Sequence, residues 1–386
     1  MRSSKYWYLL LLVAPFVNIV NFRIGEVAGL LMMILPLTLF VFTAKKRNSF
    51  NHYEKSVYKL LICSLLVIII GFSFSLVYSI DNFYYYRFFC LSFILFPAFF
   101  FCGDSELFIK TNLLFFLKYY IVLISGSILI GTILKSVGMD HLEPMYDVEK
   151  WSYLNRPFGI FGQPSVNSSL LCFFYIFHRA AAKLWLNKYL KGKDWLFWIV
   201  TVGVVLQGSG SGFLSYVLVL LCKFSGNRYN IPWLRILLIS IVGLLGLYEV
   251  VISGVVDKIS LDYINFLIDF VSEDLIDPYK KMIKNDAYLL WGVPDFPLSI
   301  DLGPLYMLGT IGLIVTLFIF VFLFYMFRQT RSLDMKIGFI MLIVGNLHYP
   351  VMFYMIMHFM WYIIIYYVLV IEKTSQGSIK EVKLVN

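Results

Sequence analysis

One arginine lies in a short polar tract between two long apolar stretches of the chain. Residues 155–167 read Asn-Arg-Pro-Phe-Gly-Ile-Phe-Gly-Gln-Pro-Ser-Val-Asn. Glycine and proline favour turns, so Arg156 is expected in a loop at the edge of a membrane. A guanidinium carries a fixed fork of donors that matches paired phosphate oxygens. The tract therefore predicts a contact with the phosphate or pyrophosphate of a lipid headgroup; the simpler interpretation is an ordinary polar loop.

Other residues suited to binding phosphate or sugar are predicted on the same side of the membrane. Arg87 follows three tyrosines, and one of them, Tyr85, offers an aromatic face on which a sugar ring can stack. The structural alternative for Arg87 is an arginine that extends to the membrane interface. The remaining substrate-binding candidates are polar or basic residues of the predicted outer loops: Gln163, Lys280, Lys281 and Lys284. For the lysines, the alternative is the solvated face of a helix.

Two residues are candidates for a general base. Asp301 lies where a long outer loop re-enters the membrane, and its other interpretation is the N-cap of the helix that follows. His348 lies at the outer end of an apolar segment, beside Pro350, and its other interpretation is a hydrogen-bonded turn residue. Together with Arg156, they form the predicted catalytic set. Their types alone do not decide which one accepts the proton.

The composition predicts an all-α polytopic membrane protein. Sixty per cent of the residues are hydrophobic, 14% are charged, and the mean hydropathy is +0.80. Apolar runs of about 20 residues, long enough to cross the hydrocarbon core as helices, recur along the whole chain. About twelve such segments are expected, near residues 7–22, 27–44, 57–79, 88–102, 113–134, 168–186, 193–207, 211–226, 233–252, 302–327, 336–348 and 351–371.

Charge predicts the orientation of these segments. With twelve spans and both termini cytoplasmic, 23 of the 32 Lys and Arg residues fall inside and 9 outside, as the positive-inside rule requires. Residues 1–386 then form a single membrane domain with two large outer loops, at about 135–167 and 253–301. The net charge of +9 is explained by topology and anionic lipid, so nucleic acid is not expected as a partner.

Neither a metal nor a cofactor is expected from the residue pattern. The five cysteines all lie in or beside apolar segments, and no spacing typical of a zinc site occurs.

Several short motifs resemble those of the bacterial O-antigen and capsular polysaccharide polymerases, which are similar to the O-antigen ligases. Residues 156–165 resemble the R-P-x-G-x-F-x-(E/N)-P-(S/N) tract of these enzymes, and residues 208–212 resemble their S-R-(S/T)-G turn. The succession G-x-G, S-D-x-G and G-x-x-G is similar to residues 291–294, 299–303 and 309–312. Three features depart from the pattern: Gln163 replaces a carboxylate, Gly210 replaces the arginine of the turn, and the arginine that relatives often carry ahead of the G-x-G segment is missing. Lys280, Lys281 or Lys284 could replace that arginine only as point charges.

The resemblance implies a metal-independent glycosyltransferase with a fold similar to the GT-C type, in the bacterial cytoplasmic membrane. Such an enzyme joins undecaprenyl-pyrophosphate-linked oligosaccharide units on the outer face of the cytoplasmic membrane. It is surrounded by membrane lipid. A flippase and a chain-length regulator are its expected protein partners. Two alternatives remain at this point: an O-antigen ligase that transfers the glycan to lipid A core, and an exporter of polysaccharide or lipid-linked sugar. The histidine typical of the ligases has no counterpart beside Asp301, which favours the polymerase.

Overall fold

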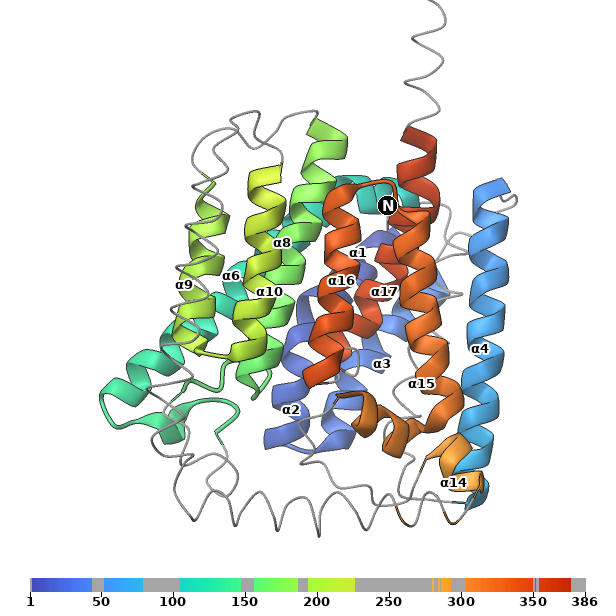
Figure 1. The fold of residues 1–386 in the computed structure, drawn as a ribbon, viewed down its shortest axis with the longest axis horizontal. Helices are drawn as coiled ribbons and strands as arrows, with labels where there is room; N and C mark the ends of the chain where they lie inside the picture. Colours follow the sequence, from blue (N-terminus) through green and yellow to red (C-terminus); the bar gives the residue numbers. More distant parts are fainter. Residues whose placement is uncertain are drawn as a thin grey trace, which may run out of the picture.

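The computed structural model describes most of the chain, and the described part is helical almost throughout (Figure 1). No strand occurs in this part. The described residues are 2–43, 52–78, 105–146, 156–186, 194–225, 280, 284, 286–292, 303–349, 351 and 354–375.

The first half of the chain contributes long helices joined at sharp breaks. The first predicted segment, 7–22, is divided by the 3-10 turn η1, which begins next to Pro15, a residue that cannot donate a backbone hydrogen bond. The described helices up to residue 186 are α1 (Arg2–Val13), η1 (Ala14–Phe16), α2 (Val17–Arg23), α3 (Glu26–Thr43), α4 (His52–Tyr78), α6 (Ser105–Ser136), η2 (Asp140–Leu142) and α8 (Pro164–Leu186).

The second half contributes one long helix, α15, and several shorter ones, some of which have defined caps. Asp194 caps the start of α9 by accepting from Phe197 N, and Gly208 ends this helix in the left-handed conformation. The described helices from residue 194 onward are α9 (Trp195–Gln207), α10 (Gly210–Ser225), α14 (Asp286–Trp291), α15 (Gly303–Gln329), α16 (Leu333–His348), α17 (Met355–Tyr366) and the π-helical turn η5 (Tyr367–Ile371).

Ten of the twelve apolar segments predicted from sequence coincide with described helices. The predicted divisions near Gly208 and after His348 are confirmed, since separate helices lie on either side of each. The segments 88–102 and 233–252 lie outside the described residues. Four described helical segments are long and apolar enough to cross a membrane: Tyr6–Arg23, Glu106–Ser136, Tyr306–Gln329 and Ile356–Ser375.

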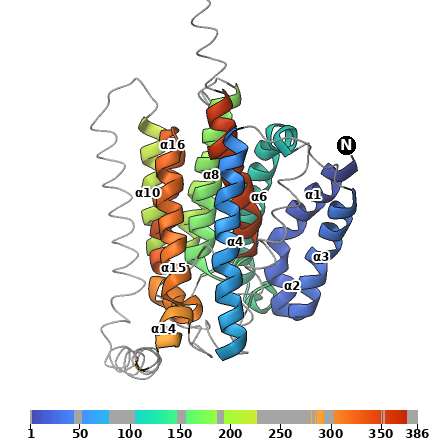
Figure 2. The same ribbon diagram turned by 90° about the vertical axis from the view of Figure 1, so that its right-hand side faces the viewer.

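Helix α8 lies at the centre of one half of the bundle. It packs against α6, α9, α10 and α16, and almost all of its side chains are buried. Figure 2 shows α1, α2 and α3 on one side of the molecule and α10, α15 and α16 on the other, with α8 between them. Helix α8 therefore meets helices, such as α16, that are distant from it in sequence.

Two glycines allow a close crossing of backbones beside α15. Gly312 has a positive φ of 74° and interrupts the helix six residues after Tyr306. A Cβ atom there would lie 2.2 Å from the carbonyl oxygen of Leu290, and one on Gly292 would lie 2.5 Å from that of Thr310. The motifs around residues 291–294 and 309–312 thus meet in space, and their glycines are needed for packing.

Candidate functional site

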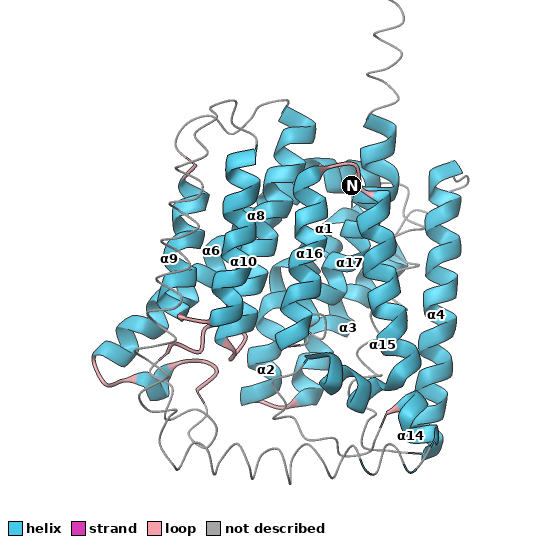
Figure 3. Ribbon diagram, viewed as in Figure 1, coloured by secondary structure: helices cyan, strands magenta, loops and turns pink. Residues whose placement is uncertain are grey.

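The predicted tract forms a compact loop between α6 and α8. We call residues 156–163 the Arg156 loop; Figure 3 shows it among the connections gathered at one end of the helices. The loop turns at Gly159 and Gly162, whose φ values are 62° and 70°. One boundary differs from the sequence prediction. Residues 164–167 were expected in the outer loop but form the first turn of α8, because Pro164 suits the first position of a helix.

Asn167 holds the loop from the first turn of α8. This fully buried amide donates to the carbonyl oxygens of Phe158 at 2.7 Å and Gln163 at 2.9 Å, and it accepts from Phe161 N at 3.3 Å. A Cβ on Gly159 would lie 2.7 Å from the Asn167 amide nitrogen, so the glycine makes room for this side chain. The last residue of the predicted tract therefore holds three of the others, Phe158, Phe161 and Gln163.

Helix α9 supplies a second buried amide. Gln207 Nε2 donates to the Pro157 carbonyl at 3.0 Å, while its Oε1 accepts from Asn167 at 3.3 Å. Gln207 is also fully buried, so both amides are satisfied inside the protein. The two side chains together fix the loop against α8 and α9.

Glu143 provides the buried carboxylate of the site. Its side chain accepts from Phe158 N at 2.7 Å and lies beside Gly159 N, and the residue is only 1% exposed. Burial raises the pKa of Glu143, although the N–H groups of Phe158 and Gly159 and the nearby Lys135 act in the opposite direction. Gly131 on α6 leaves the space for this carboxylate, since a Cβ there would lie 2.5 Å from Glu143 Oε2.

Helix α6 holds the loop from its other side. Lys135 Nζ donates to the carbonyl oxygen of Arg156 and lies 4.6 Å from the centre of the Phe158 ring. Ser127 Oγ accepts from Ile160 N at 3.1 Å. Side chains from α6, α8 and α9 thus fix the backbone from Arg156 onward.

Arg156 itself has a fixed backbone and an uncommitted side chain. The residue is half-buried, and within the described ranges its guanidinium forms neither an ion pair nor a hydrogen bond. Lys135 takes only its carbonyl oxygen. A guanidinium that no carboxylate neutralises, on a loop held this rigidly, is suited to bind an anion.

The other predicted residues divide into three groups. Gln163 lies in the Arg156 loop, where its carbonyl oxygen accepts from Asn167 N at 3.0 Å and so takes part in the helix start. Lys280 and Lys284 are exposed, and the nearby α14 packs against α15 and α4, whereas the Arg156 loop contacts α6, α8 and α9. Four candidates lie outside the described residues: Arg87, Tyr85, Lys281 and Asp301.

His348 is the last residue of α16, and the turn after it reaches the loop. The Phe161 ring lies edge-on to the Tyr354 ring at 5.5 Å, and Val351 packs against Gly345. The structure therefore brings Tyr354, at the start of α17, against the Arg156 loop.

The resembling turn at residues 208–212 has a packing role. A Cβ on Gly212 would lie 2.5 Å from Ser168 Cβ, so α10 and α8 approach closely here. Ser209 Oγ accepts from Gly212 N at 3.4 Å at the start of α10. These contacts explain the small residues without any catalytic role.

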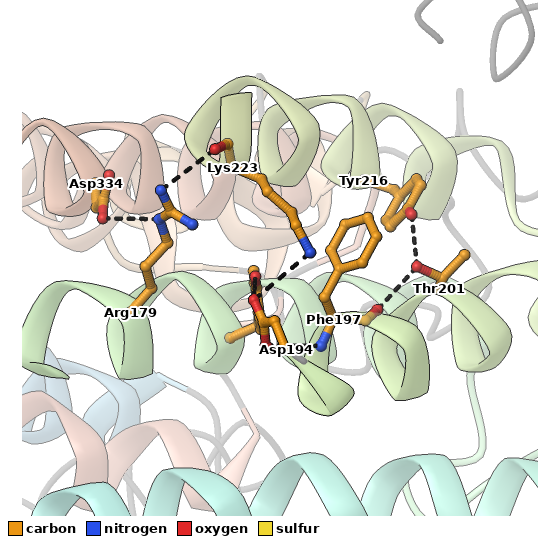
Figure 4. Close-up of polar contacts among 8 residues, drawn as sticks. Arg179, Asp194, Phe197, Thr201, Tyr216, Lys223 and Asp334 are labelled. Carbon is orange, nitrogen blue, oxygen red and sulfur yellow. Dashed lines mark hydrogen bonds and ion pairs between the residues drawn. The ribbon is translucent and has the colours of Figure 1, made fainter. Parts of the chain in front are cut away.

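A second group of charged residues lies farther along α8 and was overlooked in the sequence. Arg179 is fifteen residues from Pro164, roughly 22 Å along the helix. We call the group the charged cluster; it comprises Arg179, Lys183, Asp194, Lys223 and Asp334. Figure 4 shows how α8, α9, α10 and α16 contribute to it.

Each carboxylate of this cluster is paired with at least one cation, and the three cations outnumber the two carboxylates by one. Asp334 Oδ2 lies 3.3 Å from Arg179 Nε and 2.5 Å from Lys183 Nζ. Asp194 Oδ2 accepts from the Tyr175 hydroxyl at 2.5 Å and lies 3.6 Å from Lys223 Nζ. Asp334 and Arg179 are 1% and 6% exposed. The arrangement is that of a buried structural ion-pair network joining four helices.

Periodicity alone could not have identified Glu143, Lys135 or Gln207 as site residues. Each lies at a helix end or in a connection, and each acts through contacts to a segment distant in sequence. The available signal was a polar residue at the boundary of an apolar segment, which is common in membrane proteins.

Within the described ranges, no group of three or more His, Cys, Asp and Glu side chains is placed to hold a metal ion. Comparison of the chain with protein-family models, with curated proteins and with solved structures finds no match in any of the three.

Proposed function

We propose that this protein is a membrane glycosyltransferase that polymerises oligosaccharide units linked to undecaprenyl pyrophosphate, making O-antigen or capsular polysaccharide. In this proposal the chain crosses the bacterial cytoplasmic membrane twelve times, with both termini in the cytoplasm. The Arg156 loop then faces the outer side. A flippase would deliver the substrate, and a chain-length regulator would act beside the enzyme.

The observation that carries this proposal is the environment of Arg156. Side chains from α6, α8 and α9 fix the loop backbone, yet the guanidinium has no carboxylate partner among the described residues. Holding a loop this rigidly is useful where a cation must meet a ligand in one orientation. A lipid pyrophosphate at a membrane surface offers the paired oxygens that such a guanidinium binds best.

The proposed reaction transfers a glycan between two lipid carriers. The hydroxyl oxygen at the non-reducing end of the incoming unit attacks the anomeric carbon of the growing chain. The bond between that carbon and the pyrophosphate oxygen breaks, and undecaprenyl pyrophosphate leaves with the bonding electrons. Arg156, assisted by Arg87 and Lys281, stabilises the charge on the leaving group. Asp301 or His348 accepts the hydroxyl proton.

An exporter is the second candidate, because buried charges within helices often line transport paths. Arg179 on α8 and Asp334 on α16 are such charges. Their mutual pairing gives them a structural explanation, and Arg156, which has no ion pair among the described residues, lies near the other end of α8. These features favour the enzyme over the exporter.

Purified protein decides between these candidates. Detergent-solubilised enzyme given lipid-linked repeat units should form polymer, because no sealed compartment is needed for transferase chemistry. Substrate movement across sealed vesicles without new glycosidic bonds would support the exporter and contradict the proposal. Transfer to lipid A core, with no polymer formed on undecaprenyl pyrophosphate, would indicate a ligase.

A further inference from the structure

Arg23 is a cation that the sequence analysis passed over, and the fold places it beside the Arg156 loop. It is the last residue of α2 and lies on the surface. Its Nε donates to the Pro144 carbonyl at 2.8 Å and its Nη2 to the Glu143 carbonyl at 2.7 Å. The Phe22 ring, with its centre 5.3 Å from the guanidinium carbon, supports the same side chain.

These contacts hold the guanidinium without neutralising it. Carbonyl oxygens carry no net charge, and within the described ranges Arg23 has no ion pair with a carboxylate. A guanidinium has five N–H donors, and the two carbonyls use two of them. Arg23 therefore presents its remaining donors and its charge at the surface in a fixed orientation.

Glu143 connects Arg23 to the Arg156 loop. Its carbonyl oxygen accepts from Arg23, and its carboxylate accepts from Phe158 N, two residues beyond Arg156. Arg23 and Arg156 thus lie on either side of one buried residue, although 133 positions separate them in sequence. Lys135, the third cation here, is already bound to the Arg156 carbonyl.

We infer that Arg23 is a second anion-binding residue of this site. Arg156 binds one phosphate of a lipid diphosphate, and Arg23 contacts the other. The inference rests on the proposed function, in which the ligand is a lipid diphosphate. It adds a specificity: two guanidiniums, one held by carbonyl oxygens and one carried by a fixed loop, match two phosphates, so the site prefers a diphosphate to a monophosphate. Arg23 then determines this preference by binding the second phosphate.

The test compares two probes, polyprenyl diphosphate and polyprenyl monophosphate with the same chain, on the purified full-length protein in nanodiscs. Wild-type protein should bind the diphosphate about tenfold more tightly, the difference expected from one hydrogen bond between charged groups. Arg23→Gln should remove this preference while leaving monophosphate affinity within about twofold, whereas Arg156→Gln should weaken binding of both. Arg328→Gln removes an exposed arginine at the other end of the helices and should change nothing.

Two results would overturn the inference. The first is an unchanged diphosphate preference in Arg23→Gln. The second is an equal loss of affinity for both probes with a lower melting temperature, which would mean that Arg23 only secures the loop. Arg23→Lys, which keeps the charge but loses the paired donors, should show an intermediate preference in a normally folded protein. Wild-type protein that binds neither probe would instead contradict the proposed function itself, and this inference with it.

Discussion

The two ends of helix α8 hold their charged residues in opposite ways. At the end that begins with Pro164, neutral amides and one carboxylate fix a loop whose arginine has no partner among the described residues. At the other end, Arg179 and Lys183 share Asp334, and Lys223 lies beside Asp194. Buried charges that pair with one another maintain structure, whereas a cation on a fixed loop, with no ion pair among the described residues, is available to a ligand.

The two ends also differ in what holds the backbone. The Arg156 loop depends on side-chain amides that bond to main-chain groups, which fixes the loop without using its cation. The charged cluster joins the side chains of four helices directly. We therefore expect substitutions at the first end to affect activity and those at the second end to affect stability.

The largest effect should come from removing the unpaired cation. Arg156→Ala should lower polymerisation by at least about 100-fold, the usual cost of losing one group that stabilises developing charge. Long chains should disappear from glycan ladders while single-unit products persist, and the amount of membrane protein should stay normal. Arg156→Lys should recover only part of the activity, since paired donors are lost. Normal ladders from Arg156→Ala would show that Arg156 is not needed for polymerisation and would contradict a functional role for this end of α8.

The orientation of the two ends can be tested with a matched pair of cysteines. Leu142 and Leu333 are 57% and 56% exposed but lie at opposite ends of the bundle. In a background without the native cysteines, Leu142→Cys should react with an impermeant thiol reagent in intact cells. Leu333→Cys should react only after the membrane is opened. The reverse pattern would place the Arg156 loop in the cytoplasm and exclude the proposed substrate.

A substitution in the charged cluster should lower the free energy of unfolding. Asp334→Asn leaves Arg179 and Lys183 without their shared carboxylate, which should cost about 3 kcal/mol of unfolding free energy. Activity per folded molecule should stay near the wild-type value. Glu106→Gln breaks an exposed pair with Lys110 and should cost less than about 0.5 kcal/mol, as a control. Melting curves and activity measured on the same samples would separate the two effects. A folded Asp334→Asn protein without activity would make the cluster part of the site.

Loosening the loop should have a smaller and mixed effect. Asn167→Ala removes the amide that bonds Phe158, Gln163 and Gln207, at a cost of about 2 kcal/mol for the groups left unsatisfied. Polymerisation should fall, and the loop should become more sensitive to protease. The control is Asn112→Ala on α6, whose amide bonds only within its own helix and should leave activity unchanged. Equal activity of the two variants would show that loop rigidity is unimportant.

The smallest effect concerns Glu143. Burial raises its pKa above the ordinary value of 4.5, so the folded protein binds this proton more tightly than the unfolded chain does. The group therefore stabilises the fold most below pH 4.5, and that contribution is lost as the pH rises through the higher folded pKa. In Glu143→Gln the unfolding free energy should therefore change less with pH across this window. The difference from wild type, summed over the window, should be less than about 1 kcal/mol. An unchanged slope would show that Glu143 does not titrate there.

Sequence reasoning located the helices well because apolar length and charge control them directly. The break between α9 and α10 follows from Gly208, which adopts the left-handed conformation, and from the serines after it. The end of α16 at His348 was also anticipated. The predicted end of the first outer loop, at about residue 167, was wrong. Residues 164–167 begin α8, and Asn167 acts from inside that helix.

The site was only partly predictable. Arg156 was identified because its neighbours are turn formers, which is a local property. Arg23, Glu143 and Gln207 act on the loop from connections and helix ends that are distant in sequence. Arg179 lies within a predicted apolar segment, and only the position of Asp334 on α16 explains how its charge is accommodated. Such pairings depend on the tertiary arrangement of helices, which periodicity does not specify.

The most direct measurement is an experimental structure of the full-length protein with polyprenyl diphosphate bound in a nanodisc. The account predicts phosphate density beside the Arg156 loop, with a phosphate oxygen about 2.8 Å from the Arg156 guanidinium. Lys183 and Lys223 should keep their aspartate partners. Diphosphate bound at the charged cluster, with Arg156 left free, would contradict the account.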